Sequence, residues 1–169
     1  MGLKWGDIDF NRAVININRI QVLKKGTNIL EFGHPKTAKS RREITMPEML
    51  KNELEIHKSQ QEKNKEEYGD YYQDDDLVLC CNDCGIPFKN SSIGSNFRSM
   101  ARKAGYPISF HDLRHIHASL LLKAGEHPKV VSERLGHSQI GITLDIYSHV
   151  MPGMQKETAK KIDNLLANE

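Results

Sequence analysis

Apolar and polar residues alternate in the first part of the chain, as they do in strands that bury one face of a sheet. The stretch 12–23 (RAVININRIQVL) predicts such a strand, and a glycine turn in KKGTN leads to a returning strand in ILEFG. A third short strand is expected at 43–46. Together these segments predict a small antiparallel sheet of three strands.

Helical spacing of the apolar residues begins after Pro47. A first helix with a highly charged tail is expected from its apolar positions, Met49, Leu50, Leu54 and Ile56. A second helix is expected in SSIGSNFRSMARKAG, with a serine cap at its start and Gly105 at its end. Ser109 and Asp112 have the spacing of a capping box, which predicts that a third helix begins at Phe110.

The rest of the chain predicts a core built from short helices. The third helix is expected to bury three leucines, Leu113, Leu120 and Leu121. The next helix is expected to begin at Pro128 and end at Gly136, with an apolar face formed by Val130, Val131 and Leu135. Ser138 is expected to cap a further helix whose apolar positions are Ile140, Leu144 and Tyr147. The predicted fold class is α+β, a mostly helical single domain of residues 1–169 with a small antiparallel three-stranded sheet.

Charge is unevenly distributed, although the formal net charge is only +2. One basic cluster comprises Lys36, Lys39, Arg41 and Arg42, and a second comprises Lys89, Arg98, Arg102 and Lys103. Acidic residues concentrate between them in the sequence, from Glu66 to Asp76. Such polarity attracts a polyanion, although solvated surface charge explains either cluster taken alone.

The composition also excludes several classes of protein. No apolar run approaches the roughly 18 residues of a membrane span, so no membrane partner is expected. The three cysteines, an odd number within LCCNDCG, favour reduced thiols and a cytoplasmic location over a disulfide framework. Cys81 and Cys84 have C-x-x-C spacing, but no second pair completes a zinc site. No bound metal is therefore expected.

The sequence HDLRH places two phosphate-binding groups near the start of the third helix. His111 and Arg114 are three residues apart and therefore lie on one helix face. A helix N-terminus adds free N–H groups and partial positive charge. Two further candidates follow in the sequence, His137 and Tyr147. Taken singly, however, each of the four residues has an ordinary structural explanation. His137 is explained by a place in a turn, and Tyr147 by a place in the core.

Taken together, HDLRH, ERLGHSQIGITLDIYSHV and the lysine of PKTAKSRREI resemble the catalytic domain of the tyrosine recombinases, in particular integrases of Gram-positive phages and conjugative transposons. The resemblance extends from Leu3 to about Met154. Its specificity lies in the combination of His-x-x-Arg, Leu-Gly-His and a tyrosine ten residues after that histidine.

The resemblance implies a site-specific recombinase that acts on double-stranded DNA in the integration or excision of a mobile element. A tyrosine attacks a phosphodiester and gives a 3′-phosphotyrosine and a free 5′-hydroxyl, without ATP. The chemistry explains these residue types. A phenol with a pKa of about 10 must lose its proton as it attacks. The transition state needs cationic donors, and the departing 5′-oxygen must receive a proton.

Residue by residue, the resemblance makes Tyr147 the nucleophile and Arg114 the ligand of the scissile phosphate. His111 donates to the phosphate or helps to take the tyrosine proton, and His137 hydrogen-bonds a nonbridging oxygen. Lys36 matches the hairpin lysine that protonates the 5′-oxygen.

Lys39 is the alternative to Lys36, because the register within a basic loop is not fixed by one sequence. The residues expected to bind DNA outside the catalytic set are Lys39, Arg41, Arg42, Arg98 and Arg102. His115 and His117 are interpreted as structural or supporting residues.

One departure from the family pattern concerns its first catalytic arginine. That residue precedes a sequence like Leu3-Lys4-Trp5 by a few positions, and the chain begins after that point. Loss of such an arginine costs about 10²–10⁵ in rate. We therefore expect an N-terminally truncated catalytic domain, without the upstream DNA-binding domains and with little or no strand-transfer activity.

The last segment predicts another helix from the spacing of Met154, Ala159, Ile162, Leu165 and Leu166. This helix either packs on its own domain or docks onto a neighbouring protomer in a recombination tetramer.

Other functions remain open at this stage. Two short helices around Gly136 loosely resemble a helix-turn-helix, which favours a non-catalytic DNA-binding module, and an inactive integrase remnant is a further alternative. A metal-dependent hydrolase lacks support, because the sequence contains no H-E-x-x-H or comparable set of ligands.

Overall fold

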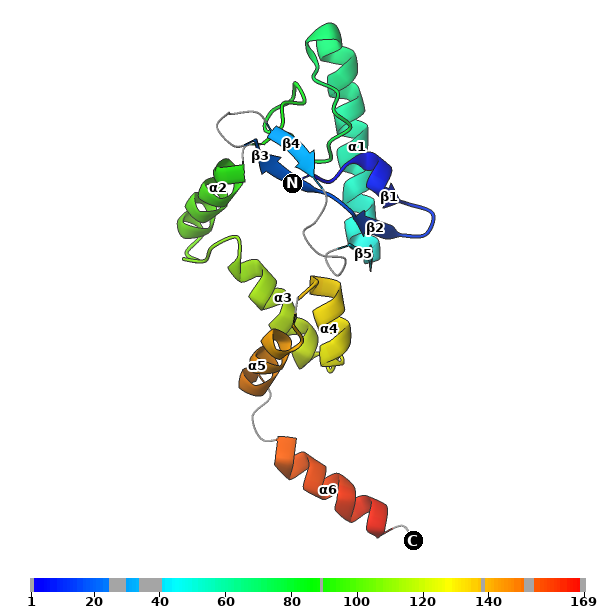
Figure 1. The fold of residues 1–169 in the computed structure, drawn as a ribbon, viewed down its shortest axis with the longest axis vertical. Coiled ribbons are helices and arrows are strands. Elements are labelled where there is room, and N and C mark those ends of the chain that lie inside the picture. Colours follow the sequence, from blue (N-terminus) through cyan, green and yellow to red (C-terminus); the bar gives the residue numbers. More distant parts are fainter. Residues whose placement is uncertain are drawn as a thin grey trace. The chain divides into compact units, whose positions relative to one another are not determined.

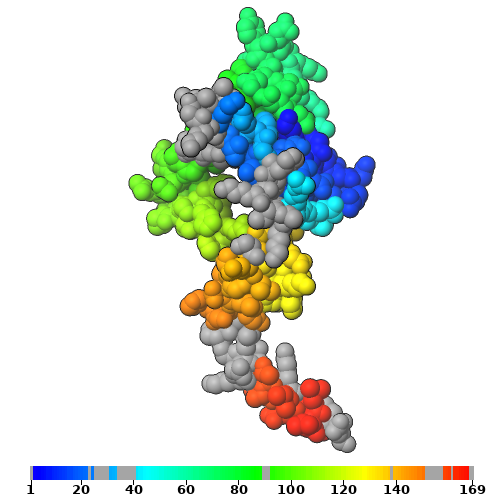
Figure 2. All heavy atoms as spheres, in the orientation of Figure 1, coloured from blue at the N-terminus to red at the C-terminus, as the bar shows by residue number. Residues whose placement is uncertain are grey.

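The computed structural model describes residues 2–24, 30–33, 41–88, 90–137, 139–150 and 154–167. These residues belong to two compact units, Met1–Phe110 and His111–Glu169. The first unit contains the strands and two long helices, and the second is helical (Figure 1). Figure 2 shows all heavy atoms of the chain in the same orientation. The predicted α+β class with a small antiparallel sheet is confirmed.

The sheet differs from the prediction in which strands it contains. Its order is β1 (Ile8–Asp9), β2 (Val14–Ile17) and β5 (Arg42–Thr45), all antiparallel. A separate antiparallel pair is formed by β3 (Ile20–Leu23) and β4 (Leu30–Gly33).

The single strand predicted for 12–23 is therefore wrong. The chain leaves extended pairing at Asn18 and Arg19, so each half of the segment pairs with a different partner. The short β1, which lacks an alternating pattern long enough to be recognised, supplies the third strand of the main sheet.

The core of the first unit gathers around the short 3₁₀ helix η1 (Trp5–Asp7). Helix α1 (Glu48–Tyr68) is followed by a second 3₁₀ turn, η3 (Gly69–Tyr71), and by α2 (Asn90–Lys103). The buried cluster consists of Trp5, Ile8, Ile15, Met46 and Val78.

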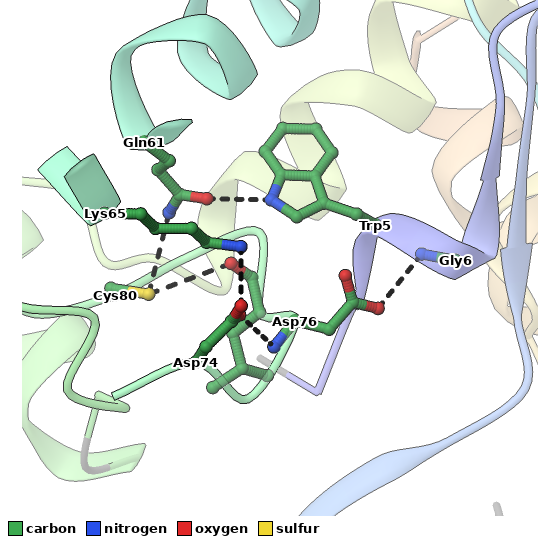
Figure 3. Close-up of polar contacts among 8 residues, drawn as sticks. Trp5, Gly6, Gln61, Lys65, Asp74, Asp76 and Cys80 are labelled. Carbon is green, nitrogen blue, oxygen red and sulfur yellow. Dashed lines mark hydrogen bonds and ion pairs between the residues drawn. The ribbon is translucent and has the colours of Figure 1, made fainter. Parts of the chain in front are cut away.

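A buried polar network joins this core to α1 and to the loop after η3 (Figure 3). The indole Nε1 of Trp5 donates to Oε1 of Gln61 at 2.7 Å, and Gln61 is itself buried. The amide nitrogen of Gln61 donates in turn to the carbonyl of Val78 at 3.3 Å. Because all three groups lie away from water, each hydrogen bond satisfies an atom that would otherwise be buried without a partner.

The same loop is held at two further points, as Figure 3 shows. Oδ2 of Asp76 accepts from the backbone N–H of Gly6 at 3.2 Å. Lys65 Nζ lies 2.9 Å from Oδ2 of Asp74, and its hydrogen bond to that carboxylate is the main reason that the pKa of Asp74 is lowered. These contacts join the loop to the N-terminal segment and to helix α1.

The second unit consists of α3 (Asp112–Lys123), α4 (Pro128–Leu135), α5 (Gly141–Val150) and α6 (Met154–Leu166). Helix α3 begins at Asp112 and not at the predicted Phe110, and α4 has the predicted Pro128 at its start. The buried core of this unit is Ala118, Leu122, Val131 and Leu135.

The predicted core faces need correction at several positions. Leu113, Leu120 and Val130 are 37%, 62% and 52% exposed, because the inward faces instead carry the i, i+4 pairs Ala118 with Leu122 and Val131 with Leu135. In α5 the inward face is formed by Thr143, Ile146 and Tyr147, whereas Ile140 and Leu144 are exposed.

Gly136 ends α4 in the left-handed conformation, with φ +67° and ψ +44°. The N–H of Gly136 donates to the carbonyl of Glu133, and the N–H of His137 donates to the carbonyl of Ser132, both at 3.0 Å. This pair of bonds is a Schellman motif, which satisfies helix carbonyls and fixes the direction in which the chain leaves the helix. The predicted helix end is confirmed, and it determines where His137 lies.

We predict that Gly136→Ala lowers the free energy of unfolding by about 1 kcal/mol, because a Cβ is unfavourable at this backbone conformation. Chemical denaturation followed by circular dichroism measures the change. Gly141→Ala is the matched control, since an added Cβ meets no atom within 4 Å there and φ is not positive. Equal stability of the two variants would contradict the role given to Gly136.

Candidate functional site

Arg114 lies in the first turn of α3, and its Nε donates a hydrogen bond of 3.1 Å to Nε2 of His137. The two residues are 23 positions apart in the sequence. Burial lowers the pKa of the Arg114 guanidinium from its ordinary value, but an arginine in a protein stays protonated at neutral pH. A partly buried cation therefore lies in direct contact with an imidazole.

Hydrogen bonds to residues of α3, α4 and α5 hold His137 after the end of α4. Its backbone N–H donates to Ser132, its Nε2 accepts from Arg114, and its Nδ1 lies 2.7 Å from Oγ1 of Thr143. Thr143 is on α5 and fully buried. The ring is thus held by elements on both sides of it.

Thr143 is a residue that the sequence predictions missed. The available signal was a hydroxyl within the otherwise apolar face of GITLDIY, four positions before Tyr147. A buried hydroxyl needs a hydrogen-bond partner, but a sequence pattern does not identify that partner.

His111 precedes the first residue of α3, where its carbonyl accepts from the backbone N–H of Arg114 at 3.0 Å. Its exposed ring meets that of His115 edge to face, with the centroids 5.1 Å apart. His117 is half-buried, and burial, followed by the charge of Arg134, lowers its pKa. His111 therefore lies one turn before Arg114. The lowered pKa of His117 favours the neutral form of its ring.

Tyr147 lies on α5, one turn after Thr143, and its half-buried ring packs against the core of the second unit. Among the described residues, its hydroxyl makes no hydrogen bond with Arg114 or His137. The structure thus joins Arg114 with His137 and leaves Tyr147 in apolar contacts nearby in the same unit.

Lys36 and Lys39 lie outside the described residues, so their predicted roles have no structural account here. Among the predicted DNA-binding residues of the first unit, Arg42 is in β5 and pairs with Ile17. Arg41 is exposed and lines a shallow hollow with Arg19.

Arg98 and Arg102 are exposed one helical turn apart on α2. They line a second open hollow of about 330 Å³, together with Ser95, Ser99 and Lys103. Spacing of i and i+4 directs both guanidinium groups to the same side of the helix. The predicted pair of arginines therefore forms one continuous basic strip.

No group of three or more His, Cys, Asp or Glu side chains is arranged to hold a metal ion within the described ranges. The three cysteines are free thiols. None of the helices in the described part of the chain has both the length and the apolar composition to cross a membrane.

Comparison with known proteins gives related sequences over nearly the whole chain. A Tyrosine recombinase XerC-like protein of Caldanaerobacter subterraneus subsp. tengcongensis is 32% identical over 98% of this chain and 45% of its own length. The ICEBs1 integrase of Bacillus subtilis is 31% identical over 98% of this chain and 44% of its own length. The chain therefore spans less than half the length of these relatives.

The fold is likewise shared with solved structures. The Tn1549 transposon integrase, in complex with transposon right end DNA, superposes with a TM-score of 0.76 at 21% identity, over 96% of this chain and 53% of the chain in that structure. The XerA recombinase gives a TM-score of 0.64. Residues 1–153 match the model of the Phage integrase family. The chain therefore belongs to the phage integrase family, the tyrosine recombinases, as the His-x-x-Arg and Leu-Gly-His sequences predict.

Proposed function

We propose that residues 1–169 are the catalytic domain of a site-specific recombinase that cleaves and rejoins duplex DNA in the integration or excision of a mobile element. The observation that carries this proposal is the hydrogen bond between Arg114 and His137, which brings together two residues of the family pattern. The proposal is further supported because the chain belongs to the phage integrase family and is similar in sequence to integrases of mobile elements.

Arg114 and His137 bind the scissile phosphate in this proposal. After Nε has donated to His137, the guanidinium still has four N–H groups on its two Nη atoms, enough for a bidentate bond to phosphate oxygens. The partly buried position strengthens this attraction, because fewer water molecules screen it. The two side chains stabilise the negative charge that develops on the nonbridging oxygens.

Tyr147 is the nucleophile in this proposal. Its Oη forms a bond to phosphorus while the bond from phosphorus to the 5′-oxygen breaks, which leaves a 3′-phosphotyrosine and a 5′-hydroxyl. The phenol proton passes to His111 or to water, and Lys36, with Lys39 as the alternative, gives a proton to the 5′-oxygen. The ring of Tyr147 leaves its apolar contacts to reach the phosphate, and the covalent bond conserves the energy that rejoining needs.

Double-stranded DNA is the proposed substrate and partner. Its phosphates are bound outside the catalytic set by Lys39, Arg41, Arg42, Arg98 and Arg102. The solved Tn1549 integrase structures contain transposon or circular-intermediate DNA, which supports a DNA-binding role for the shared fold. The proposed reaction uses no cofactor, and its location is the cytoplasm, where free thiols such as those of the three cysteines persist.

Helix α6 supports assembly into a tetramer on DNA. Its apolar side chains Ile162, Leu165 and Leu166 are 51–73% exposed. Exposed leucines at helical spacing favour contact with another protein surface, and we assign them to a neighbouring protomer.

A suicide DNA substrate, which traps the covalent intermediate, tests the proposed chemistry. We predict that the chain joined to its upstream residues forms a covalent protein–DNA adduct and that Tyr147→Phe abolishes it, because the variant has no hydroxyl to attack phosphorus. Denaturing gel electrophoresis measures the adduct. Tyr106→Phe, which removes an exposed phenol from the first unit, is the control and should leave the adduct unchanged.

An adduct that persists in Tyr147→Phe would exclude Tyr147 as the nucleophile. A chain that binds duplex DNA but forms no adduct in any form would favour the second candidate function. That function is a DNA-binding module without catalysis, such as an integrase remnant, and it is supported by the exposed arginines of α2.

Salt dependence of duplex binding tests the basic strip on α2. We predict that Arg102→Ala weakens binding to all duplex sequences alike and reduces the slope of log K against log [salt] by about 1, as expected when one phosphate contact is lost. Fluorescence anisotropy measures both quantities. Lys63→Ala removes an equal charge from an exposed site on α1 and is expected to leave the slope unchanged. Equal slopes for Arg102→Ala and the unmodified chain would show that α2 does not contact DNA.

A further inference from the structure

The hydrogen bond from Arg114 determines which nitrogen of His137 carries a proton. An arginine Nε has an N–H and no lone pair to accept with, so it is always the donor. Nε2 of His137, 3.1 Å away, is therefore the acceptor and carries no proton. A histidine with an unprotonated Nε2 is neutral, and its proton is on Nδ1.

This assignment gives a direction to the contact with Thr143. Nδ1–H donates to Oγ1 of Thr143, at 2.7 Å. Thr143 is fully buried, and its own backbone N–H is bound to the carbonyl of Ile140 at 2.9 Å in the first turn of α5. The hydroxyl thus occupies a fixed position that water does not reach.

Catalysis requires the opposite arrangement at Nε2. To bind a nonbridging phosphate oxygen, Nε2 must donate a proton and no longer accept one from Arg114. The ring reaches that state when Nε2 takes a proton from water. If Nδ1 keeps its own proton, the ring becomes positively charged. If Nδ1 releases its proton to water, the ring stays neutral. A hydroxyl both accepts and donates, so Thr143 can bind Nδ1 in each of these states.

We propose that Thr143 is the positioning residue of His137, and that its buried hydroxyl holds the ring plane while Nε2 changes from a hydrogen-bond acceptor toward Arg114 to a donor toward DNA phosphate. This inference rests on the proposed recombinase function and adds to it the group through which His137 is aimed. A hydrogen-bond partner on the other ring nitrogen commonly fixes the tautomer and orientation of a functional imidazole. The hydroxyl of threonine meets this requirement, whereas valine has nearly the same shape and no polar group.

Long-range ¹H–¹⁵N spectra of the histidine rings test the arrangement in this chain without DNA, under mildly alkaline conditions that keep the ring neutral. We expect His137, assigned from the signal that His137→Asn removes, to carry its proton on Nδ1 in the unmodified chain. Thr143→Ser is expected to give the same pattern. Thr143→Val leaves Nδ1–H buried without an acceptor and no longer holds the ring plane, so a substantial fraction of the rings is expected to turn away from Arg114 and carry the proton on Nε2.

Two spectroscopic results would overturn the proposal. One is a proton on Nε2 in the unmodified chain, and the other is an identical pattern in a folded Thr143→Val variant. Circular dichroism and thermal unfolding establish whether that variant is folded. If it is not, the unmodified chain and Thr143→Ser decide, because both must show the Nδ1 proton.

A kinetic arm separates this inference from the function on which it rests. With the chain joined to its upstream residues, Thr143→Val is expected to lower the rate of adduct formation at saturating DNA about 10- to 100-fold, the size found for second partners of other functional histidines. Its duplex affinity should stay within about twofold, because Thr143 is buried and does not touch DNA.

Thr143→Ser should restore the rate, and a Thr143→Val variant as fast as the joined chain without substitutions would overturn the proposal. Absence of any adduct in the joined chain without substitutions would contradict the recombinase function, while the spectra still decide the role of Thr143.

Discussion

The hydrogen bond between Arg114 and His137 is the interaction on which the candidate site depends. It joins the first turn of α3 to the turn after α4, and it brings a cation and an imidazole within 3.1 Å of each other. Neither residue indicates a phosphate site alone, since surface arginines and turn histidines are common. Their contact in a partly buried position brings the free Nη–H groups of Arg114 next to an imidazole that can become a donor, and this arrangement suits an anion.

The rest of the second unit keeps these two side chains in place. The apolar core of Ala118, Leu122, Val131 and Leu135 packs α3 against α4. Gly136 then ends α4 with the two hydrogen bonds of a Schellman motif, so the next residue, His137, has a defined starting point. A core of small and medium side chains at i, i+4 spacing thus positions the polar groups at its edge.

Sequence patterns predicted local features that depend on neighbouring residues. Pro128 at the start of α4 and Gly136 at its end were predictable, because backbone restrictions of proline and glycine act within one or two residues. Helical spacing also placed His111 and Arg114 in adjacent turns. That Leu122 is buried and Leu120 exposed was not predictable. Leucines occupy adjacent faces of this helix, and only the elements that pack against it decide which face lies in the core.

Long-range contacts were beyond prediction from one sequence. Nothing in the alternation of 12–23 indicates that its two halves pair with different strands, since pairing depends on partners distant in the chain. The bond from Thr143 to His137 is of the same kind, because the threonine has no local signal of its partner. Family resemblance supplied the predicted roles of the candidate catalytic residues, which stay predictions together with the positions of Lys36 and Lys39.

The central claim is that Arg114 and His137 act as one unit on one phosphate. A double-mutant cycle on the rate of adduct formation tests it most directly, using Arg114→Ala, His137→Ala and the double variant in the chain joined to its upstream residues. Each single substitution is expected to lower the rate by about 10²–10³, and the double variant by little more, because the loss of either residue disables the shared site. Losses that multiply to about 10⁴–10⁶ in the double variant would show two independent contributions and contradict the account.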